Sequence, residues 1–127
     1  MAARRRRGGG GRPPWLILYT PLEGLEVCIL VHPDPSLRGL RGRVVLETRR
    51  CLVVEFGGSR RRCVEKRGAL LAFKQGSGGW VLVRGEEILG SLWERLKRLE
   101  KGRGVVWLVG SGEERRYTGC EPAGEDL

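Results

Sequence analysis

The sequence lacks most of the residue sets that support catalysis or metal binding. It contains a single histidine, His32, and nothing near it in the sequence supplies the nucleophile and orienting group of a catalytic pair or triad. Its carboxylates stand singly at predicted strand ends or beside arginines, unlike the spaced sets that bind metal. We therefore expect no catalytic residue, metal site or cofactor in this chain, and we expect His32 to be an ordinary turn residue.

The four cysteines form no C-x-x-C pair, which argues against a zinc ribbon or a redox motif. Cys51 and Cys63 flank a predicted turn at Gly57 and Gly58, so a hairpin there would let them face each other. Disulfides are rare in the cytosol outside hyperthermophiles. A bridge between these two residues is therefore the less favoured of two open alternatives.

Long hydrophobic runs and aromatic residues are also scarce. No apolar run approaches the roughly 20 residues that a membrane span needs, and the basic start of the chain has no apolar segment or cleavage pattern typical of a secretory signal. We expect a cytoplasmic protein without membrane contact. Aromatic residues make up 6% of the chain and stand mostly at core-like positions, so the sequence does not predict a platform on which single-stranded bases stack.

Positive charge is what the sequence has in excess. Lysine and arginine number 24 against 15 acidic residues, for a net charge of +9. Five of the arginines lie in residues 1–12, and without them the remainder carries +4. Such a surplus indicates a polyanionic partner. Arginine forks match phosphate oxygens, so we favour recognition of the phosphates and shape of a folded RNA.

Short strand-like runs separated by turn residues occupy the middle of the chain. They predict strands over 25–31, 42–47, 51–56, 60–65, 69–74 and 80–83, with a further run at 105–109 that fits a last strand. Runs this short and this closely spaced are typical of a mainly β, small antiparallel barrel or sandwich. Closure into a barrel would also remove exposed sheet edges.

The sequence period changes from two to 3.6 residues after Gly90. Ser91 and Glu94 fit a capping box, and an apolar stripe of Leu92, Trp93, Leu96 and Leu99 predicts an amphipathic helix over 91–101. Ahead of the strands, the segment 15–19 is apolar enough to dock on the body, as either a short strand or a helical turn. We predict one domain over 15–110, between a disordered basic tail at 1–14 and a C-terminal tail at 111–127.

The arginines of the body gather around the predicted hairpin of strands 51–56 and 60–65. Its turn would place 60–62 near the tip, while 49–50 and 66–67 meet at the base, so that one ribbon presents a basic strip. For any single arginine, a merely solvated barrel face is an equal alternative. The candidate RNA-binding residues are Arg38, Arg41, Arg43, Arg49, Arg50, Arg60, Arg61, Arg62, Lys66 and Arg67.

Side chains of the apolar segment 15–19 and of the predicted helix are candidates for contacts with a protein partner. They could equally cap the barrel, and the sequence does not separate these alternatives. The residues concerned are Trp15, Leu16, Ile17, Leu92, Trp93, Arg95 and Leu96.

The order of motifs between Leu22 and Leu99 resembles the archaeal ribonuclease P protein component 1 family, which is related to a eukaryotic ribonuclease P and MRP subunit. The most specific piece is PSLRGLRGRVVLET, residues 35–48, followed by Lys66, ALLAFK, Gly85, EILG and a basic helix. The chain departs from the family pattern at two places. It has Arg-Cys at 50–51 where the family usually has Asn-Thr, and Ser-Leu at 91–92 where the family commonly has Arg-Pro.

The resemblance implies a strongly bent, Sm-like or SH3-like barrel that serves as a subunit of the ribonucleoprotein removing 5′ leaders from precursor tRNA. It implies that the RNA with its Mg²⁺ carries catalysis, while this chain binds the ribonuclease P RNA and assists its folding. The implied protein partners are a zinc-ribbon ribonuclease P protein and other subunits. A ribosomal or other SH3-like RNA-binding barrel, or a protein-interaction module without RNA, are the alternatives that the residues leave open.

Overall fold

A computed structural model of the chain describes residues 13–76 and 79–109. The strands are β1 (Glu26–Val31), β2 (Arg41–Glu47), β3 (Cys51–Phe56), β4 (Arg60–Glu65), β5 (Leu70–Lys74), β6 (Trp80–Arg84) and β7 (Val106–Val109). The helix α1 spans Leu92–Arg98. Short 3-10 turns are η2 (Pro14–Tyr19), η3 (Pro35–Leu37), η4 (Gly57–Ser59), η5 (Gly85–Ile88) and η6 (Leu99–Lys101).

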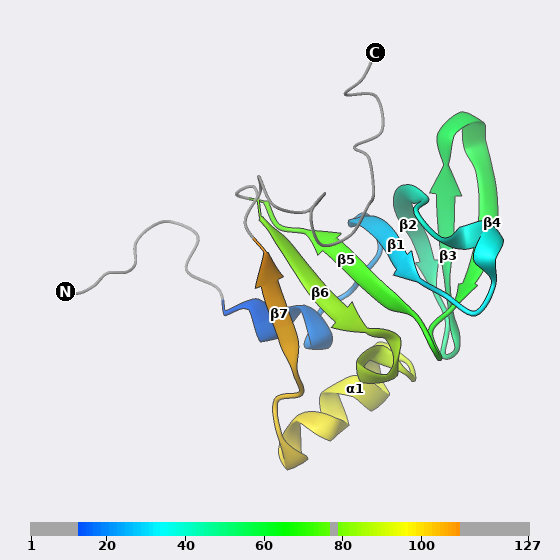
Figure 1. Cartoon of the computed structure of the whole chain (residues 1–127). Helices are drawn as coiled ribbons and strands as arrows, with labels where there is room; N and C mark the ends of the chain where they lie inside the picture. The colour runs from blue at the N-terminus through cyan, green and yellow to red at the C-terminus, as the bar shows by residue number, and fades with distance from the viewer. Residues whose placement is uncertain (1–12, 77–78, 110–127) are drawn as a thin grey trace.

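The strands form one antiparallel sheet in the order β4-β3-β2-β1-β5-β6-β7 (Figure 1). The register shifts between Ile29 and Val31 in β1 and between Val44 and Leu46 in β2. Such bulges bend a strand and increase its twist, and the bent sheet encloses a single main core. Buried apolar side chains from the first six strands, η2 and η5 fill this core.

The mainly β, antiparallel fold expected from the sequence is confirmed, and each strand boundary falls within one residue of its prediction. The structure differs from the expectation in how the sheet ends, because its two outermost described strands do not pair with each other. Within the described residues the ladder runs in one line from β4 to β7, so these two strands remain the edges of the sheet. Exposed charges along β4, at residues 60–62, are a usual protection against edge-to-edge pairing.

The apolar segment near the N-terminus docks on the body as the 3-10 turn η2. Pro14 stands at its first position, where a fixed φ and a missing N–H do no harm, and Ile17 and Leu18 are buried. The predicted tails 1–14 and 111–127 lie outside the described residues, apart from Pro13 and Pro14. In the described ranges no helix is long and apolar enough to cross a membrane.

The helix α1 begins with the capping box that the sequence predicts. The Ser91 hydroxyl accepts the Glu94 N–H, and the Glu94 carboxylate accepts the Ser91 N–H at 2.8 Å. The predicted apolar stripe is divided: Leu92 and Leu99 are half-buried, whereas Trp93 is 68% exposed and Leu96 38% exposed. Arg95 is instead the fully buried residue of the helix, and its ionic partners explain this orientation.

Candidate nucleic-acid interface

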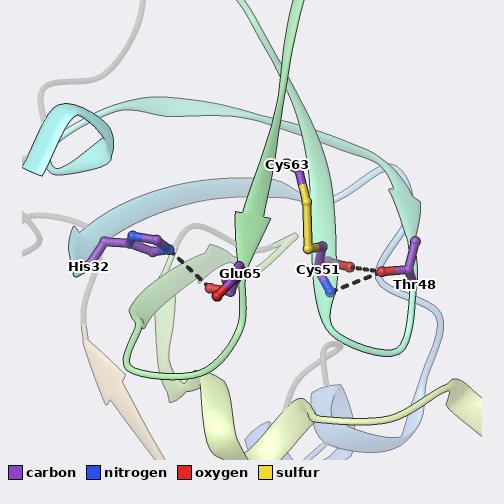
Figure 2. Close-up of a disulfide and its surroundings, with 5 residues drawn as sticks. All are labelled: His32, Thr48, Cys51, Cys63 and Glu65. Atoms are coloured by element: carbon purple, nitrogen blue, oxygen red, sulfur yellow. Dashed lines mark hydrogen bonds between the residues drawn. A yellow bond between two sulfur atoms is a disulfide. The ribbon is translucent and has the colours of Figure 1, made fainter. Parts of the chain in front are cut away.

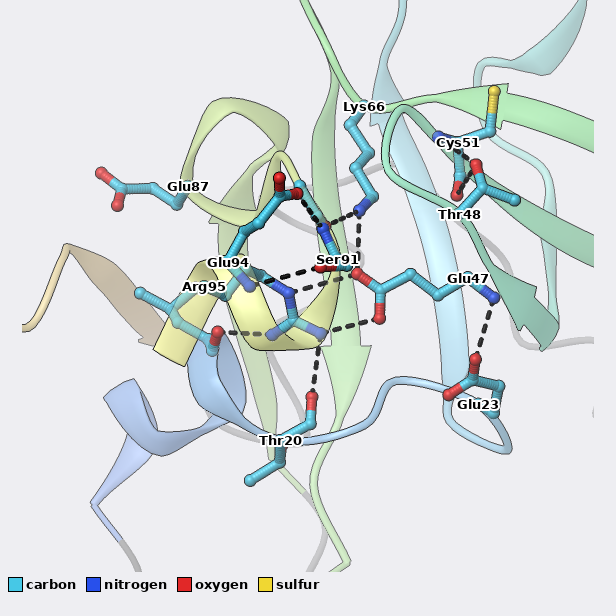
Figure 3. A network of polar contacts seen from close by, with 12 residues as sticks. Thr20, Glu23, Glu47, Thr48, Cys51, Lys66, Glu87, Ser91, Glu94 and Arg95 are labelled. Atoms are coloured by element: carbon cyan, nitrogen blue, oxygen red, sulfur yellow. Dashed lines mark hydrogen bonds and ion pairs between the residues drawn. The ribbon is translucent and has the colours of Figure 1, made fainter. Parts of the chain in front are cut away.

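A buried ionic network holds the helix, the sheet and η2 together (Figure 3). The Glu47 carboxylate at the end of β2 accepts a hydrogen bond from Lys66 Nζ at 2.8 Å and another from Arg95 Nη2 at 2.7 Å. Arg95 Nε also donates to Glu47, at 3.2 Å. Other donors reach backbone carbonyls: Lys66 donates to Gly90 O at 3.0 Å, and Arg95 donates to the carbonyls of Leu18 and Thr20. One carboxylate is therefore the shared counter-charge of two buried cations.

This network removes Lys66 and Arg95 from the predicted contact residues. Both side chains are 0% exposed, so neither can meet an RNA phosphate or a protein partner at the surface. Burial lowers the pKa of Lys66, because it disfavours the charged ammonium, while the hydrogen bond and charge of Glu47 oppose that shift. The cations here fix the position of secondary-structure elements.

Arg41 is a second correction to the predicted RNA-binding set. Its side chain is 7% exposed and forms an ion pair with Glu26, and its guanidinium lies 4.7 Å from the centre of the Trp80 ring. The guanidinium thus stacks on an aromatic ring and also pairs with a partly buried carboxylate, two interactions for which its planar, delocalised charge is suited. Arg41 therefore packs β2 against β1 and β6.

The edge strand β4 presents three consecutive exposed arginines at residues 60–62. Arg61 contacts Glu55 at 3.4 Å, and Arg62 contacts Asp34 at 3.4 Å and the Ser36 hydroxyl at 3.3 Å. Arg60 forms no ion pair with any described residue. Exposed pairs of this length contribute little to stability, so these guanidinium groups can exchange their partners for phosphate.

Further arginines lie at the base of the β3–β4 hairpin. The Lys66 N–H donates to Arg50 O at 2.8 Å and closes this end, as the predicted hairpin requires. Arg50 and Arg67 are exposed and unpaired among the described residues, whereas Arg49 contacts Glu94 at 2.9 Å. The basic strip is thus divided into a tip group and a base group, separated by Cys63, Val64 and Glu65 of β4.

The two other predicted arginines are exposed but anchored to backbone. Arg38 donates to His32 O at 3.0 Å, and Arg43 donates to Gly24 O at 2.7 Å. Arg43 pairs across the sheet with Glu55, which in turn pairs with Arg61. One carboxylate therefore stands between two guanidinium groups on this face, which leaves it net positive.

The candidates for a protein partner divide in the same way. Ile17 is buried and caps the core, and Arg95 belongs to the buried network. Trp15, Leu16 and Leu92 are partly buried. Trp93 and Leu96 project from α1 into solvent, and they remain the candidates for a partner contact.

A disulfide joins Cys51 of β3 to Cys63 of β4, with Cα atoms 5.9 Å apart (Figure 2). The sequence disfavours this bridge, but the strand register decides it, because Cys51 pairs with Glu65 and Cys63 with Val53, which puts both thiols on one face. The bridge fastens the arginine-bearing edge strand to its neighbour. It therefore limits the separation of the two strands.

His32 directly follows β1, as expected, but it is more than an ordinary turn residue, because it is only 4% exposed and holds the end of the same edge strand. The Asp34 N–H donates to His32 Nδ1 at 3.0 Å, and Nε2 lies 3.1 Å from Glu65 O. Because Nδ1 accepts a hydrogen bond, the neutral ring carries its proton on Nε2 and donates it to the Glu65 carbonyl. The imidazole links the end of β1 to the end of β4 (Figure 2).

Reduction of the disulfide is expected to lower the free energy of unfolding by about 2 to 3 kcal/mol, as the loop-entropy model gives for a short closed loop; here the cysteines are 12 residues apart. Because Cys28 is disulfide-bonded as well, a reductant would not act on this bridge alone, so the comparison is made by substitution. Urea unfolding of the oxidised wild type and of the oxidised Cys51→Ser, Cys63→Ser variant measures the difference. Equal stability of the two proteins would contradict a bridge that restrains this hairpin.

Comparison with known proteins gives a consistent set of matches. Residues 15–98 match the family model described as "Ribonuclease P/MRP, subunit p29". A "Ribonuclease P protein component 1" of Hyperthermus butylicus is 52% identical over 107 residues, which cover 84% of this chain and 96% of that protein. The protein of the same name from Desulfurococcus amylolyticus is 45% identical over 85 residues, covering 67% of this chain and 92% of its own length.

One solved structure is also similar. It is the structure of Mth11, described as a homologue of the human RNase P protein Rpp29, and it is 33% identical with a TM-score of 0.47. The match covers 60% of this chain and 97% of that one.

Proposed function

The chain belongs to the ribonuclease P/MRP subunit p29 family, and on this premise we propose that it binds the RNA of a ribonuclease P ribonucleoprotein through the exposed arginines of the β3–β4 hairpin. The complex would remove the 5′ leader of precursor tRNA. Catalysis would belong to the RNA and to Mg²⁺ held by that RNA, while this chain supplies positive charge and a fixed surface.

The observation that carries the proposal is the row of exposed arginines at 60–62 on a fastened edge strand. Guanidinium groups that neutralise phosphates release condensed counterions, and this release drives binding without any chemistry on the protein. Held in place by the sheet, the charges favour RNA conformations in which phosphates come close together. The protein would thereby reduce the Mg²⁺ that the RNA needs to fold.

A protein partner would meet the chain on another surface. Trp93 and Leu96 on α1 are exposed apolar side chains, and large exposed apolar residues that lie together are typical of partner contacts. The family resemblance implies a zinc-ribbon subunit as this partner. We assign the apolar face of α1 to that contact and the β3–β4 hairpin to RNA.

Substituting alanine for Arg60, Arg61 and Arg62 together is expected to weaken binding to the ribonuclease P RNA of the source organism at least tenfold at 0.15 M salt. The slope of log affinity against log salt should become shallower by about 2 to 3, because each lost phosphate contact removes about one unit. Filter binding over a salt series measures both quantities.

The control carries alanine at Lys74, Lys97 and Lys101, which removes the same charge from exposed positions away from the β3–β4 hairpin. It should keep the wild-type slope. Equal losses in the two variants would show that net charge alone drives binding. A wild-type slope near zero would contradict RNA binding and favour an interaction module that contacts protein only.

A further inference from the structure

A pocket of about 360 Å³ lies beside the tip of the β3–β4 hairpin and is lined by Leu40, Phe56, Arg60, Arg61 and Arg62. Leu40 packs against the main core, and Phe56 belongs to that core and is only 7% exposed. The apolar side of the pocket is therefore fixed by core packing. Its other side is lined by three consecutive arginines of the edge strand β4.

Close contact between β2 and β3 keeps the apolar side of the pocket in place; this side, formed by Leu40 and Phe56, is called the floor below. A Cβ atom added at Gly42 of β2 would lie 2.9 Å from a ring carbon of Phe56 and 2.4 Å from Glu55 O. The ring is thus held against the backbone of the neighbouring strand. A floor held this way does not need to reorganise when a ligand enters, which lowers the entropic cost of binding.

Strand register directs two of the arginines toward this floor. Arg60 pairs directly with Phe56 and Arg62 with Val54, and side chains directly opposite each other in a sheet share a face. Since Phe56 and Val54 are buried, Arg60 and Arg62 leave β4 on the core side, over the floor. Arg61 leaves on the opposite face, beside Glu55, and reaches the rim of the pocket.

The chemistry of the pocket fits one kind of ligand. Its volume lies near the lower end for small-molecule sites, and it combines a flat apolar floor with cationic groups that are free or held only by long contacts at 3.3 to 3.4 Å. A bare phosphate would leave the floor unused. A base-paired helix keeps its bases stacked inside and cannot place one there, whereas an unpaired base can leave its stack and pack against guanidinium planes.

We infer that this pocket binds a single unpaired nucleotide of the RNA, with the base between the Leu40–Phe56 floor and the guanidinium of Arg60 or Arg62, and with the flanking phosphates on the remaining arginines. This inference rests on the proposed function, since it presupposes an RNA ligand. It adds that the chain recognises an extruded base in addition to backbone phosphate. Composition alone predicts no base-stacking site, because arginine supplies the planes that aromatic residues supply elsewhere.

The test compares the full chain with two probes, a fluorescein-labelled unstructured RNA octamer and the same octamer with abasic sites at its four central positions. Both probes carry the same phosphates. Fluorescence anisotropy at low salt should show the abasic probe binding about five- to tenfold more weakly, which corresponds to the lower end of the effect of one stacked base. The Arg60→Lys, Arg62→Lys variant keeps the charge but loses the planes, so it should bind the two probes equally.

The matched control is Arg50→Lys, Arg67→Lys, at the base of the hairpin, which should keep the full preference for the probe with bases. Replacing the central nucleotides of the octamer with 4-thiouridine should crosslink them to β3 or β4. Equal wild-type affinity for both probes would overturn the inference, as would an acidic peptide of equal charge that competes as well as the octamer. Failure of the wild-type chain to bind either probe would also overturn the inference, whereas the proposed function fails only if the chain does not bind the ribonuclease P RNA in the salt series.

Discussion

Replacing Glu47 with glutamine is expected to lower the free energy of unfolding by about 3 to 5 kcal/mol, the cost of breaking a buried ion pair from one side. The substitution keeps the shape of the side chain but leaves Lys66 and Arg95 as buried cations without a counter-charge. Both are 0% exposed, so water cannot replace the carboxylate. Urea unfolding at neutral pH measures the loss.

Two further variants separate charge from packing. Glu65→Gln makes the same chemical change at an exposed position of β4 and should cost less than about 0.5 kcal/mol. Adding Lys66→Met to Glu47→Gln removes one of the two unpaired cations, so it should restore part of the lost stability. If the double variant had a lower free energy of unfolding than Glu47→Gln alone, Lys66 would stabilise the fold through its hydrogen bond to the Gly90 carbonyl rather than through Glu47.

The loss of unfolding free energy caused by Glu47→Gln should become smaller as the pH rises. In the folded protein the pKa of Lys66 lies below its ordinary value of 10.5, chiefly because of burial, and Glu47 raises it. Without Glu47 the pKa falls further. Between that folded-state pKa and the unfolded one, the unfolded chain binds more protons, so the stability of the variant increases with pH.

Unfolding curves of wild type and Glu47→Gln at a neutral and an alkaline pH test this expectation. The difference should narrow at alkaline pH without vanishing, because Arg95 keeps its charge throughout. Groups that titrate identically in both proteins cancel in the comparison. A difference that stays constant or widens would mean that Lys66 is not the group that responds.

Replacing Gly85 with alanine is expected to cost more than about 3 kcal/mol, because the added methyl group collides with backbone. Gly85 begins η5 directly after β6, where its N–H donates to Ala69 O at 2.8 Å. A Cβ atom there would lie 1.6 Å from Lys66 O and 2.5 Å from Lys66 C. A flexible side chain could move aside, but these atoms belong to the turn that places the Lys66 ammonium against Glu47.

Gly57→Ala is the matched control, since a Cβ at Gly57 meets nothing within 4 Å. Thermal unfolding should place this control close to wild type and Gly85→Ala far below it. The Lys66 N–H also closes the base of the β3–β4 hairpin on Arg50 O, so Gly85→Ala should weaken RNA binding as well. A Gly85→Ala protein of near wild-type stability would show that β6 and the turn after β4 can move apart without lowering the free energy of unfolding.

The order and bounds of the elements could be predicted because they depend on neighbours in the sequence. Short strand-like runs between turn residues mark the strands, and Ser91 with Glu94 forms the capping box that begins α1. The arginine surplus and the absence of a local catalytic set are properties of composition. Together with the motif at residues 35–48, they were sufficient to predict an RNA-associated subunit, and the comparisons confirm the family.

Which cations face solvent is a question that only the tertiary structure decided. In sequence, Lys66 and Arg95 look like the other basic residues beside them, but their shared partner Glu47 lies 19 and 48 residues away. The pocket depends in the same way on β2, β3 and β4, which bring Leu40 and Phe56 beside Arg60. Local patterns determined the strands, the turns and the helix cap, whereas long-range ionic pairing and strand register determined which charges are structural and which remain available to a ligand.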